Sequence, residues 1–269
     1  MSHSYWDKRN TTIFNHVGHW HGEEVVIEGH KLFEELMPSS SYMQVYLLNA
    51  TGRLVDRNVA DWLEKLNMGV SYPDARIWCN QIAAYAADMG CKPASAICAA
   101  QLAADSRAYG GSFSRYKGMT SLQDIYARYQ LSGDFSKALT PYLNRNNIPI
   151  VVGFARPIEK KDERLEPLEK LQNDLGIERG VYLEFAFKLA EYIYKHYKLQ
   201  WNIGGYSDAF LLDQKFTPDD GYRIGVVIIA GGAIGAYRSQ VGQHCGNSFL
   251  PQKCDDIRYS GPALRELPK

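Results

Sequence analysis

Two consecutive alanine-rich runs constrain the fold of this chain more than any other feature. They occupy residues 75–89 and 94–108; Gly90 ends the first, and Pro93 falls where the first turn of a second helix would begin. Proline suits that turn because its missing N–H has no partner there in any case. Alanine side chains let helices approach one another closely, so we expect a tightly packed helix pair within a core or across a dimer interface.

Most of the remaining sequence also has helical periodicity, and this predicts an all-α fold. From Asp56 onward, Val59, Trp62, Leu63 and Leu66 fall on one helix face. Gly204 and Gly205 are expected to break the chain before a helix at 206–214. Strand-like alternation is scarce, with residues 23–28 (EEVVIE) as the main exception. The other helices are expected at 42–52, 121–130, 135–145, 166–176 and, most clearly, 178–199.

Composition narrows the class of protein further. Thirty basic and thirty acidic residues cancel across 269 residues, which argues against a general binder of nucleic acid or anionic membranes. The apolar run at 224–236 is shorter than the roughly 20 residues of a membrane span. Because it holds Gly231, Gly232 and Gly235, it is expected to be a buried, closely packed helix. Five cysteines without a C-x-x-C pair, and a start without a secretion signal, favour a reducing, cytoplasmic location.

Three motifs carry a resemblance to a known family. Residues 153–164 (GFARPIEKKDER) combine a Gly-Phe turn with a basic loop, residues 106–112 (SRAYGGS) follow an alanine-rich helix, and residues 202–207 (NIGGYS) precede a helix. In this order and spacing they resemble the Gly-Phe-Gly-His…Asp-Pro-Arg, Leu-His-Gly-Gly-Ala and Asn-Val-Asp-Phe-Tyr-Ser motifs of the citrate synthase family. That family includes the citryl-CoA lyase part of ATP-citrate lyase.

The resemblance implies a large helical domain interrupted by a small helical one. The large domain would comprise residues 1–111 and 223–269, and the small domain residues 112–222. The family works as a homodimer with its active site in the cleft between domains. The implied partners are a small-molecule carboxylate or an acyl-CoA, with the coenzyme A thioester as substrate. No metal, nicotinamide, nucleic acid or membrane is expected.

The usual catalytic groups of the family are missing. Tyr109 stands where the first histidine is expected, and Ala155 or Arg156 where the second is expected. Gly204 replaces the aspartate that takes a proton from the acyl-CoA, and Ile229 replaces a carboxylate-binding arginine. Only the arginine of the Asp-Pro-Arg element remains. Ordinary citrate synthase activity is therefore not expected.

Other residues could have taken over these roles. The candidate catalytic groups are Tyr109, Asp74 and Asp208; the candidate substrate-binding residues are Tyr72, Arg76, Arg164, Tyr206 and Ser207. The loop that would bind the phosphates of coenzyme A contains Gly153, Phe154, Arg156, Lys160 and Lys161. Structural alternatives stand beside these roles: a helix-end charge for Asp74, loss of function by drift for Tyr109, a surface or capping role for Asp208, and a solvated face for the basic loop. His16, His19 and His21 have no acidic or cysteine partner at a recognised spacing, so a structural role is favoured over a metal site.

Three functions fit this pattern. The first is a diverged enzyme that forms or cleaves a carbon–carbon bond next to a thioester with non-standard catalytic groups. The second is thioester hydrolysis or other non-Claisen chemistry on the same fold. The third is a non-catalytic protein that binds a coenzyme A ligand or serves as a partner subunit.

Overall fold

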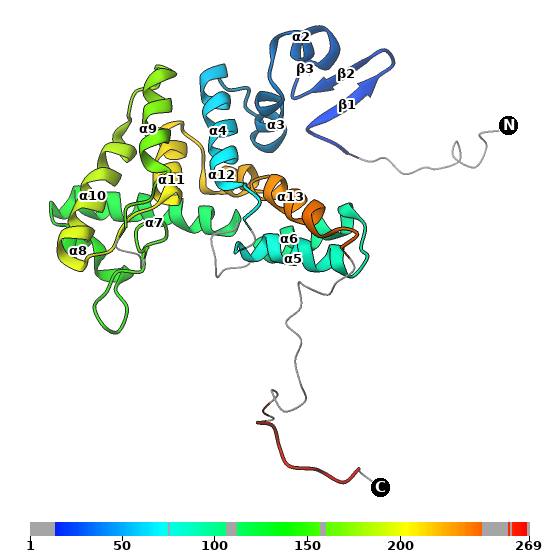
Figure 1. Cartoon of the computed structure of the whole chain (residues 1–269). Coiled ribbons are helices and arrows are strands. Elements are labelled where there is room, and N and C mark those ends of the chain that lie inside the picture. Colours follow the sequence, from blue (N-terminus) through cyan, green and yellow to red (C-terminus); the bar gives the residue numbers. More distant parts are fainter. Residues whose placement is uncertain are drawn as a thin grey trace. The chain divides into compact units, whose positions relative to one another are not determined.

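Helices dominate the computed structural model, which describes residues 14–74, 76–105, 112–156, 160–243, 258 and 260–267 (Figure 1). The chain forms two compact units, each built from separated stretches of sequence. Unit 1 comprises Met1–Ser71 and Leu102–Ile229, and unit 2 comprises Tyr72–Gln101 and Ala230–Lys269. The all-α prediction is confirmed. The predicted division into domains at residues 111 and 222 remains a prediction.

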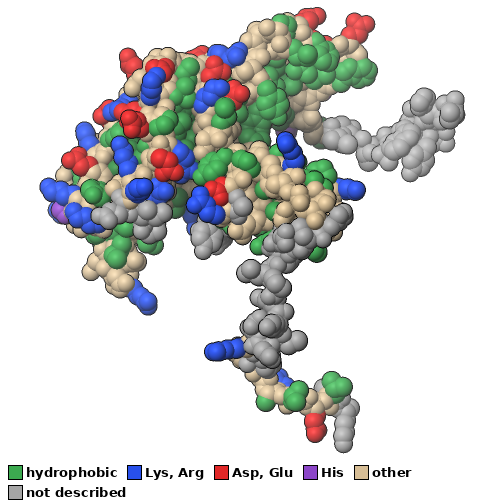
Figure 2. Space-filling view, in the orientation of Figure 1, with side chains coloured by type: hydrophobic (Ala, Val, Ile, Leu, Met, Phe, Trp, Pro, Cys, Tyr) green, Lys and Arg blue, Asp and Glu red, His purple; other side chains and the backbone are tan. Residues whose placement is uncertain are grey.

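Unit 1 begins with a small antiparallel sheet. Strands β1 (Gly18–His21), β2 (Glu24–Ile27) and β3 (His30–Lys31) lie in that order, with Trp20 opposite Val25. The strand expected at residues 23–28 is confirmed as β2, whereas β1 and β3 were not predicted. A π-helical turn η1 (Leu32–Leu36) and α2 (Met37–Ser39) follow. Trp20 is 71% exposed, and Figure 2 shows apolar side chains gathered over this end of unit 1.

Helix α3 (Tyr42–Thr51) has the predicted boundaries, and α4 (Arg57–Val70) begins where predicted. Ser41 and Gln44 form a capping box at the start of α3, and Gly52 ends it with a φ of 72°. In α4 the predicted face is buried, and Trp62 is fully enclosed. Because that face repeats at helical spacing, the sequence alone was enough to predict it.

The rest of unit 1 is a helical layer around a buried aromatic core. The Trp62 ring stacks on Phe210 with centroids 3.7 Å apart, and the Tyr206 ring lies 6.1 Å from Trp62. These residues make α11 a central helix that is buried along most of its length. The elements are α7 (Ser112–Ser132), α8 (Phe135–Leu139), the 3-10 turn η2 (Thr140–Tyr142), α9 (Leu165–Asp174), α10 (Val181–Tyr197), α11 (Ile203–Asp213) and α12 (Pro218–Gly225).

Unit 2 is a helical cluster of α5 (Trp78–Asp88), the start of α6 (Pro93–Ala104) and α13 (Ala230–Gln240). Within the described residues, the helix that packs along α5 is α13 rather than α6. Close packing of the two alanine-rich helices within one core is therefore not found among the described residues, and the alternative of packing across a dimer interface remains a prediction. Glycine explains the difference: an added Cβ at Gly232 would lie 2.7 Å from the Tyr72 carbonyl oxygen, so only glycine allows this contact.

The apolar run at 224–236 is not the single buried helix that was predicted. Helix α12 ends at Gly225, a turn occupies residues 226–229, and α13 begins at Ala230. Val226 is 47% exposed. The turn consists of four consecutive β-branched residues (VVII), whose restricted χ1 angles disfavour helix. Among the residues described, no helix combines the length and apolar character needed to cross a bilayer.

Candidate active site at the start of helix α11

The first turn of α11 meets the Gly-Phe loop through direct backbone contact. The Asn202 side chain accepts hydrogen bonds from the N–H groups of Gly204 at 2.8 Å and Gly205 at 3.4 Å, so it caps the helix. The Asn202 N–H in turn donates to the Gly153 carbonyl at 2.9 Å. The predicted break at Gly204 and Gly205 is therefore wrong, because both glycines lie inside the helix. The contact requires them: an added Cβ at Gly153 would lie 2.5 Å from the Gly205 Cα.

A buried carboxylate connects the basic loop to the same turn. Asp162, 1% exposed, accepts hydrogen bonds from Arg164 Nε and a terminal nitrogen at 2.8 Å each, and from the Ile203 N–H at 3.0 Å. Burial alone would raise the pKa of Asp162, but the Arg164 and Ile203 hydrogen bonds outweigh it and hold this pKa below its ordinary value. The Arg164 fork, expected to bind a substrate carboxylate, is thus engaged by Asp162.

The predicted phosphate loop is partly buried and partly exposed. Phe154 is 1% exposed and stacks near Trp201, so it anchors the loop in the core. One terminal nitrogen of Arg156 is buried without a hydrogen bond and lies 3.9 Å from Asp162 and 3.8 Å from Glu163. Lys160 and Lys161 are exposed. The loop therefore carries three cationic side chains, of which Lys160 and Lys161 are exposed to solvent.

Asp208 and Arg115 form a second buried charged group one turn further along α11. A terminal nitrogen of Arg115 in α7 lies 3.7 Å from Asp208 Oδ1 and donates to Ser207 Oγ at 3.2 Å. Asp208 is 3% exposed, and an added Cβ at Gly118 would overlap with its Oδ2. Burial raises the pKa of Asp208 to about 7, despite the opposing Arg115 charge, and burial lowers the pKa of Arg115. The surface or capping alternative for Asp208 is therefore wrong.

Tyr206 belongs to the core rather than to an open site. It is 1% exposed, and its hydroxyl donates to Gln172 Oε1 at 2.8 Å inside unit 1. Burial raises the pKa of Tyr206 to about 12. Its hydroxyl already has a protein partner, so this geometry gives its predicted substrate contact no support. Ser207, the next residue, is the one that faces Arg115.

The polar set at residues 72–78 lies in unit 2 and is described by itself. Arg76 binds Asp74 through its Nε at 3.0 Å and a terminal nitrogen at 2.6 Å, while its own side chain remains 89% exposed. The Arg76 hydrogen bonds lower the pKa of Asp74 to about 2. Asp74 was expected in the first turn of α5, but it lies in the turn that precedes this helix. Tyr72 is 41% exposed.

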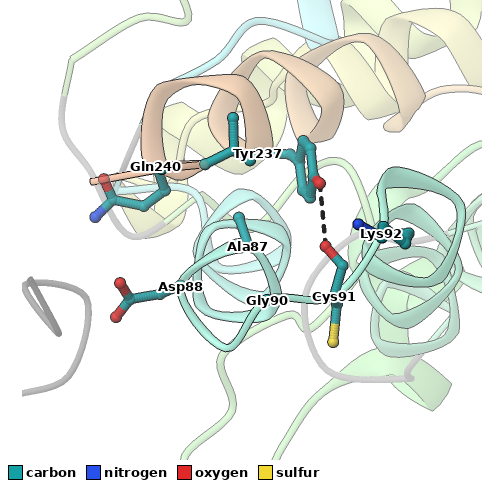
Figure 3. A pocket seen from close by; sticks show the side chains of 9 residues that line it. Ala87, Asp88, Gly90, Cys91, Lys92, Tyr237 and Gln240 are labelled. Atoms are coloured by element: carbon teal, nitrogen blue, oxygen red, sulfur yellow. Dashed lines mark hydrogen bonds between the residues drawn. The ribbon is translucent and has the colours of Figure 1, made fainter. Parts of the chain in front are cut away.

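Two hollows among the described residues lie away from every predicted site residue. In unit 2, a cavity of about 270 Å³ lies between the end of α5, the loop at residues 90–92 and the end of α13, where the Tyr237 hydroxyl donates to the Cys91 carbonyl at 3.0 Å (Figure 3). Both Asp88 carboxylate oxygens are buried there without a hydrogen bond. In unit 1, a groove of about 360 Å³ lies between α7 and α10. The described residues hold no cluster of three or more His, Cys, Asp or Glu side chains suited to a metal.

Sequence reasoning missed Arg115, and one candidate cannot be placed. Tyr109 lies outside the described residues. Arg115 is four residues before Met119 and seven before Leu122, both fully buried, so it falls on the apolar face of α7. A charged residue on an apolar face is uncommon, and that position was the signal that could have identified it.

Comparisons with solved structures identify the fold. The citryl-CoA lyase of Hydrogenobacter thermophilus matches 96% of this chain and 98% of its own, with a TM-score of 0.77 and 19% identity. The ATP citrate lyase of Methanothrix soehngenii, solved with citrate and coenzyme A, matches with a TM-score of 0.73 and 18% identity. The match includes 97% of this chain but only 44% of the length of that enzyme.

A citrate synthase of Thermoplasma acidophilum, solved with carboxymethyl coenzyme A and oxaloacetate, is more distant. It has a TM-score of 0.60 and 16% identity over 86% of this chain and 60% of its own. No protein-family model and no curated protein matches the sequence. The structural likeness nevertheless extends over nearly the whole chain, and it shows that this protein has the citrate synthase-like fold.

Proposed function

We propose that this protein acts on an acyl-CoA or a related carboxylate and forms or cleaves a carbon–carbon bond next to the thioester carbonyl. The proposal is supported by the shared fold with citryl-CoA lyase and by relatives solved with coenzyme A and citrate. One observation carries it: Asp208 is a buried carboxyl whose pKa is raised to about 7, on the helix where the family's aspartate is replaced by Gly204. Residues 204 and 208 are one turn apart, so they lie on the same face of α11.

Asp208 would act as the general base. Its carboxylate takes a proton from the carbon next to the thioester carbonyl, and the electron pair of that C–H bond moves onto the thioester oxygen. The resulting enolate then attacks the carbonyl carbon of a keto acid, which forms the new C–C bond while the C=O π electron pair moves onto the keto oxygen, and that oxygen takes up a proton to become a hydroxyl; cleavage is the reverse. A base whose pKa lies near the working pH suits this step. Because Asp208 is 3% exposed, the reaction requires a ligand-bound conformation in which the carboxyl faces the substrate.

The basic loop supplies the binding role in this proposal. Lys160 and Lys161 are exposed and Arg156 lies beside them in the chain, so the three cations suit the phosphates of coenzyme A. Arg164 would share its fork between Asp162 and a substrate carboxylate. A homodimer, as in the family, belongs to the same proposal.

Isotope exchange tests the proposal directly. Acetyl-CoA in D₂O should acquire deuterium in its methyl group when the protein is present, and Asp208→Asn should reduce the rate at least 100-fold, the scale of a lost general base. Asp61→Asn, in an exposed pair with Arg57, is the matched control and should exchange at the wild-type rate. If Asp208→Asn exchanges as fast as the wild type, Asp208 is not the base.

Non-catalytic ligand binding is the second candidate, and specific observations favour it. The Arg76 hydrogen bonds hold the pKa of Asp74 near 2, which makes it a poor base, and Arg164 is already engaged by Asp162. Coenzyme A would then raise the melting temperature without methyl exchange. Release of free thiol from acetyl-CoA, without methyl exchange, would instead indicate thioester hydrolysis. If millimolar coenzyme A leaves the melting temperature unchanged, every proposal in which this protein binds coenzyme A is contradicted.

A further inference from the structure

Arg115 is held in place from two sides. Its aliphatic stem runs under α12, where an added Cβ at Gly221 would lie 3.3 and 3.4 Å from its Cγ and Cδ. Its terminal nitrogen reaches α11, donating to Ser207 Oγ at 3.2 Å and lying 3.7 Å from Asp208 Oδ1. The side chain is 10% exposed. Three helices of unit 1 therefore fix where this positive charge sits.

The pair is poorly arranged for stability alone. A separation of 3.7 Å is beyond hydrogen-bond range, and among the described residues no N–H or O–H donates to the Asp208 carboxyl. Arg115 Nε is buried without a hydrogen-bond partner in the part of the chain that the structure describes. Burying two charges costs more than their attraction returns unless the geometry is good and their remaining atoms are hydrogen-bonded. Neither condition is met by the described residues, so the pair is not arranged for stability alone.

We propose that Arg115 is a positioning residue for Asp208: it holds the carboxyl on the face of α11 used in the proposed reaction and favours its ionised form. The inference rests on the proposed function for its purpose. The control of Asp208 by Arg115 is inferred only from the contacts between Arg115, Ser207 and Asp208, and it does not depend on the proposed reaction. Of the charged side chains described, Arg115 is the one within ion-pair distance of Asp208; Gly118 of α7 and Ser207 of α11 add no charge.

This arrangement has a chemical consequence. Burial favours the neutral acid, which cannot accept a proton, and the Arg115 charge opposes that effect. Without Arg115, the Asp208 carboxyl stays protonated at neutral pH and the base is lost. With Arg115 present, a fraction of Asp208 is ionised near neutral pH and can accept a proton. Arg115 acts through Asp208 and need not touch the substrate.

A pH profile separates positioning from a merely structural role. The deuterium-exchange rate should rise with pH as Asp208 ionises, and in Arg115→Met the midpoint should move upward by at least one pH unit. Arg115→Lys, which keeps the charge, should move it less. A purely structural role would lower the rate and leave the midpoint unchanged. Arg128→Met, on the same helix in an exposed pair with Asp124, is the matched control.

A second measurement needs no activity. The protein is labelled with ¹³C at aspartate carboxyls, and the Asp208 signal is identified by its loss in Asp208→Asn. Its titration midpoint should rise in Arg115→Met, and an unchanged midpoint overturns the inference. If that variant does not fold, Arg115→Lys gives the same test with a smaller upward shift. If exchange is absent while the midpoint still moves, the proposed reaction is wrong and the control of Asp208 by Arg115 holds.

Discussion

At the scale of single residues, two buried aspartates of unit 1 behave in opposite ways. Asp162 has three strong donors, and its pKa is held below the ordinary value. Asp208 has one cation at 3.7 Å, and burial raises its pKa to about 7. Hydrogen bonds to the charged form outweigh desolvation at Asp162, whereas no described residue donates one to Asp208. Asp162 therefore belongs to the framework, and Asp208 is the residue suited to exchange protons.

Replacing Asp208 should change how stability depends on pH. Its folded pKa, about 7, lies above its ordinary value of 3.8, so the folded state binds more protons than the unfolded state between about pH 4 and 7. The contribution of Asp208 to the free energy of unfolding is therefore greatest below pH 4, falls as pH rises to 7, and is constant above. In urea titrations, the free energy of unfolding of the wild type minus that of Asp208→Asn should decline by a few kcal/mol between about pH 4 and 7. A difference that is flat or rises with pH would contradict the assignment.

Replacing Asp162 should show the opposite sign. Asp162→Asn removes the charge that Arg164 binds, and we expect a loss of about 3 kcal/mol in the free energy of unfolding at pH 7. Because the folded pKa of Asp162 is lowered, its contribution is present above the unfolded value near 4 and is lost as pH falls through the folded pKa. Asp61→Asn, from an exposed pair, should cost less than about 1 kcal/mol in the same titrations. Equal losses in the two variants would contradict a larger stabilising role for Asp162 than for an exposed ion pair.

At the scale of elements, glycines decide which segments meet. Gly153 has a φ of 85°, and its backbone presses on Gly205, so the loop and the α11 cap share one contact. The contact joins two motifs that lie about fifty residues apart in the sequence. Any side chain at either glycine separates the basic loop from the helix that carries Asp208.

Alanine at Gly153 should therefore cost more than backbone strain alone. Gly133 has a similar positive φ of 64° and nothing within 4 Å of an added Cβ, so it is the matched control. We expect Gly133→Ala to lose about 1 kcal/mol of unfolding free energy and Gly153→Ala to lose roughly 3 kcal/mol. Denaturant titration of both variants measures the difference. Similar losses would mean that the loop moves aside without cost.

The elements also show what the sequence could predict. Helices with a one-sided apolar pattern, such as α4 and α10, could be placed to within a few residues. The helix start at Ile203 was missed because local glycine preference argues for a break, and only the distant Gly153 backbone makes glycine necessary there. The motif order was sufficient to predict the citrate synthase-like fold. The Arg115–Asp208 pair was missed because it depends on how α7 packs against α11, which no local pattern encodes.

At the scale of the whole molecule, each compact unit is assembled from separated stretches of sequence. Unit 2 depends on the contact of α5 with α13, where Gly232 fits against the Tyr72 carbonyl and Asn80. Unit 1 contains both motifs of the candidate site, the α11 turn and the basic loop. The two units can therefore be perturbed separately by substitutions at their own close contacts.

Gly232→Ala should loosen unit 2 in particular. Its Cβ would lie 2.7 Å from the Tyr72 carbonyl oxygen and 3.0 Å from Asn80 Oδ1, so α13 has to shift away from α5. Hydrogen exchange of backbone amides in both helices should become at least tenfold faster, with little change in α10 and α11. Gly69→Ala in α4, which meets nothing within 4 Å, should leave all four helices unchanged. Equal acceleration in every helix would show that the two units open together.

The pairing of α5 with α13 also has a consequence for synthesis of the chain. Helix α5 ends at residue 88, and its partner begins only at residue 230. At translation speeds of about 5–20 residues per second, α5 is synthesised roughly 7–28 seconds before its partner begins. During that interval its alanine-rich face is uncovered. Alanine offers little apolar area per residue, so the same small side chains that allow close packing later also limit unwanted association of the unfinished chain.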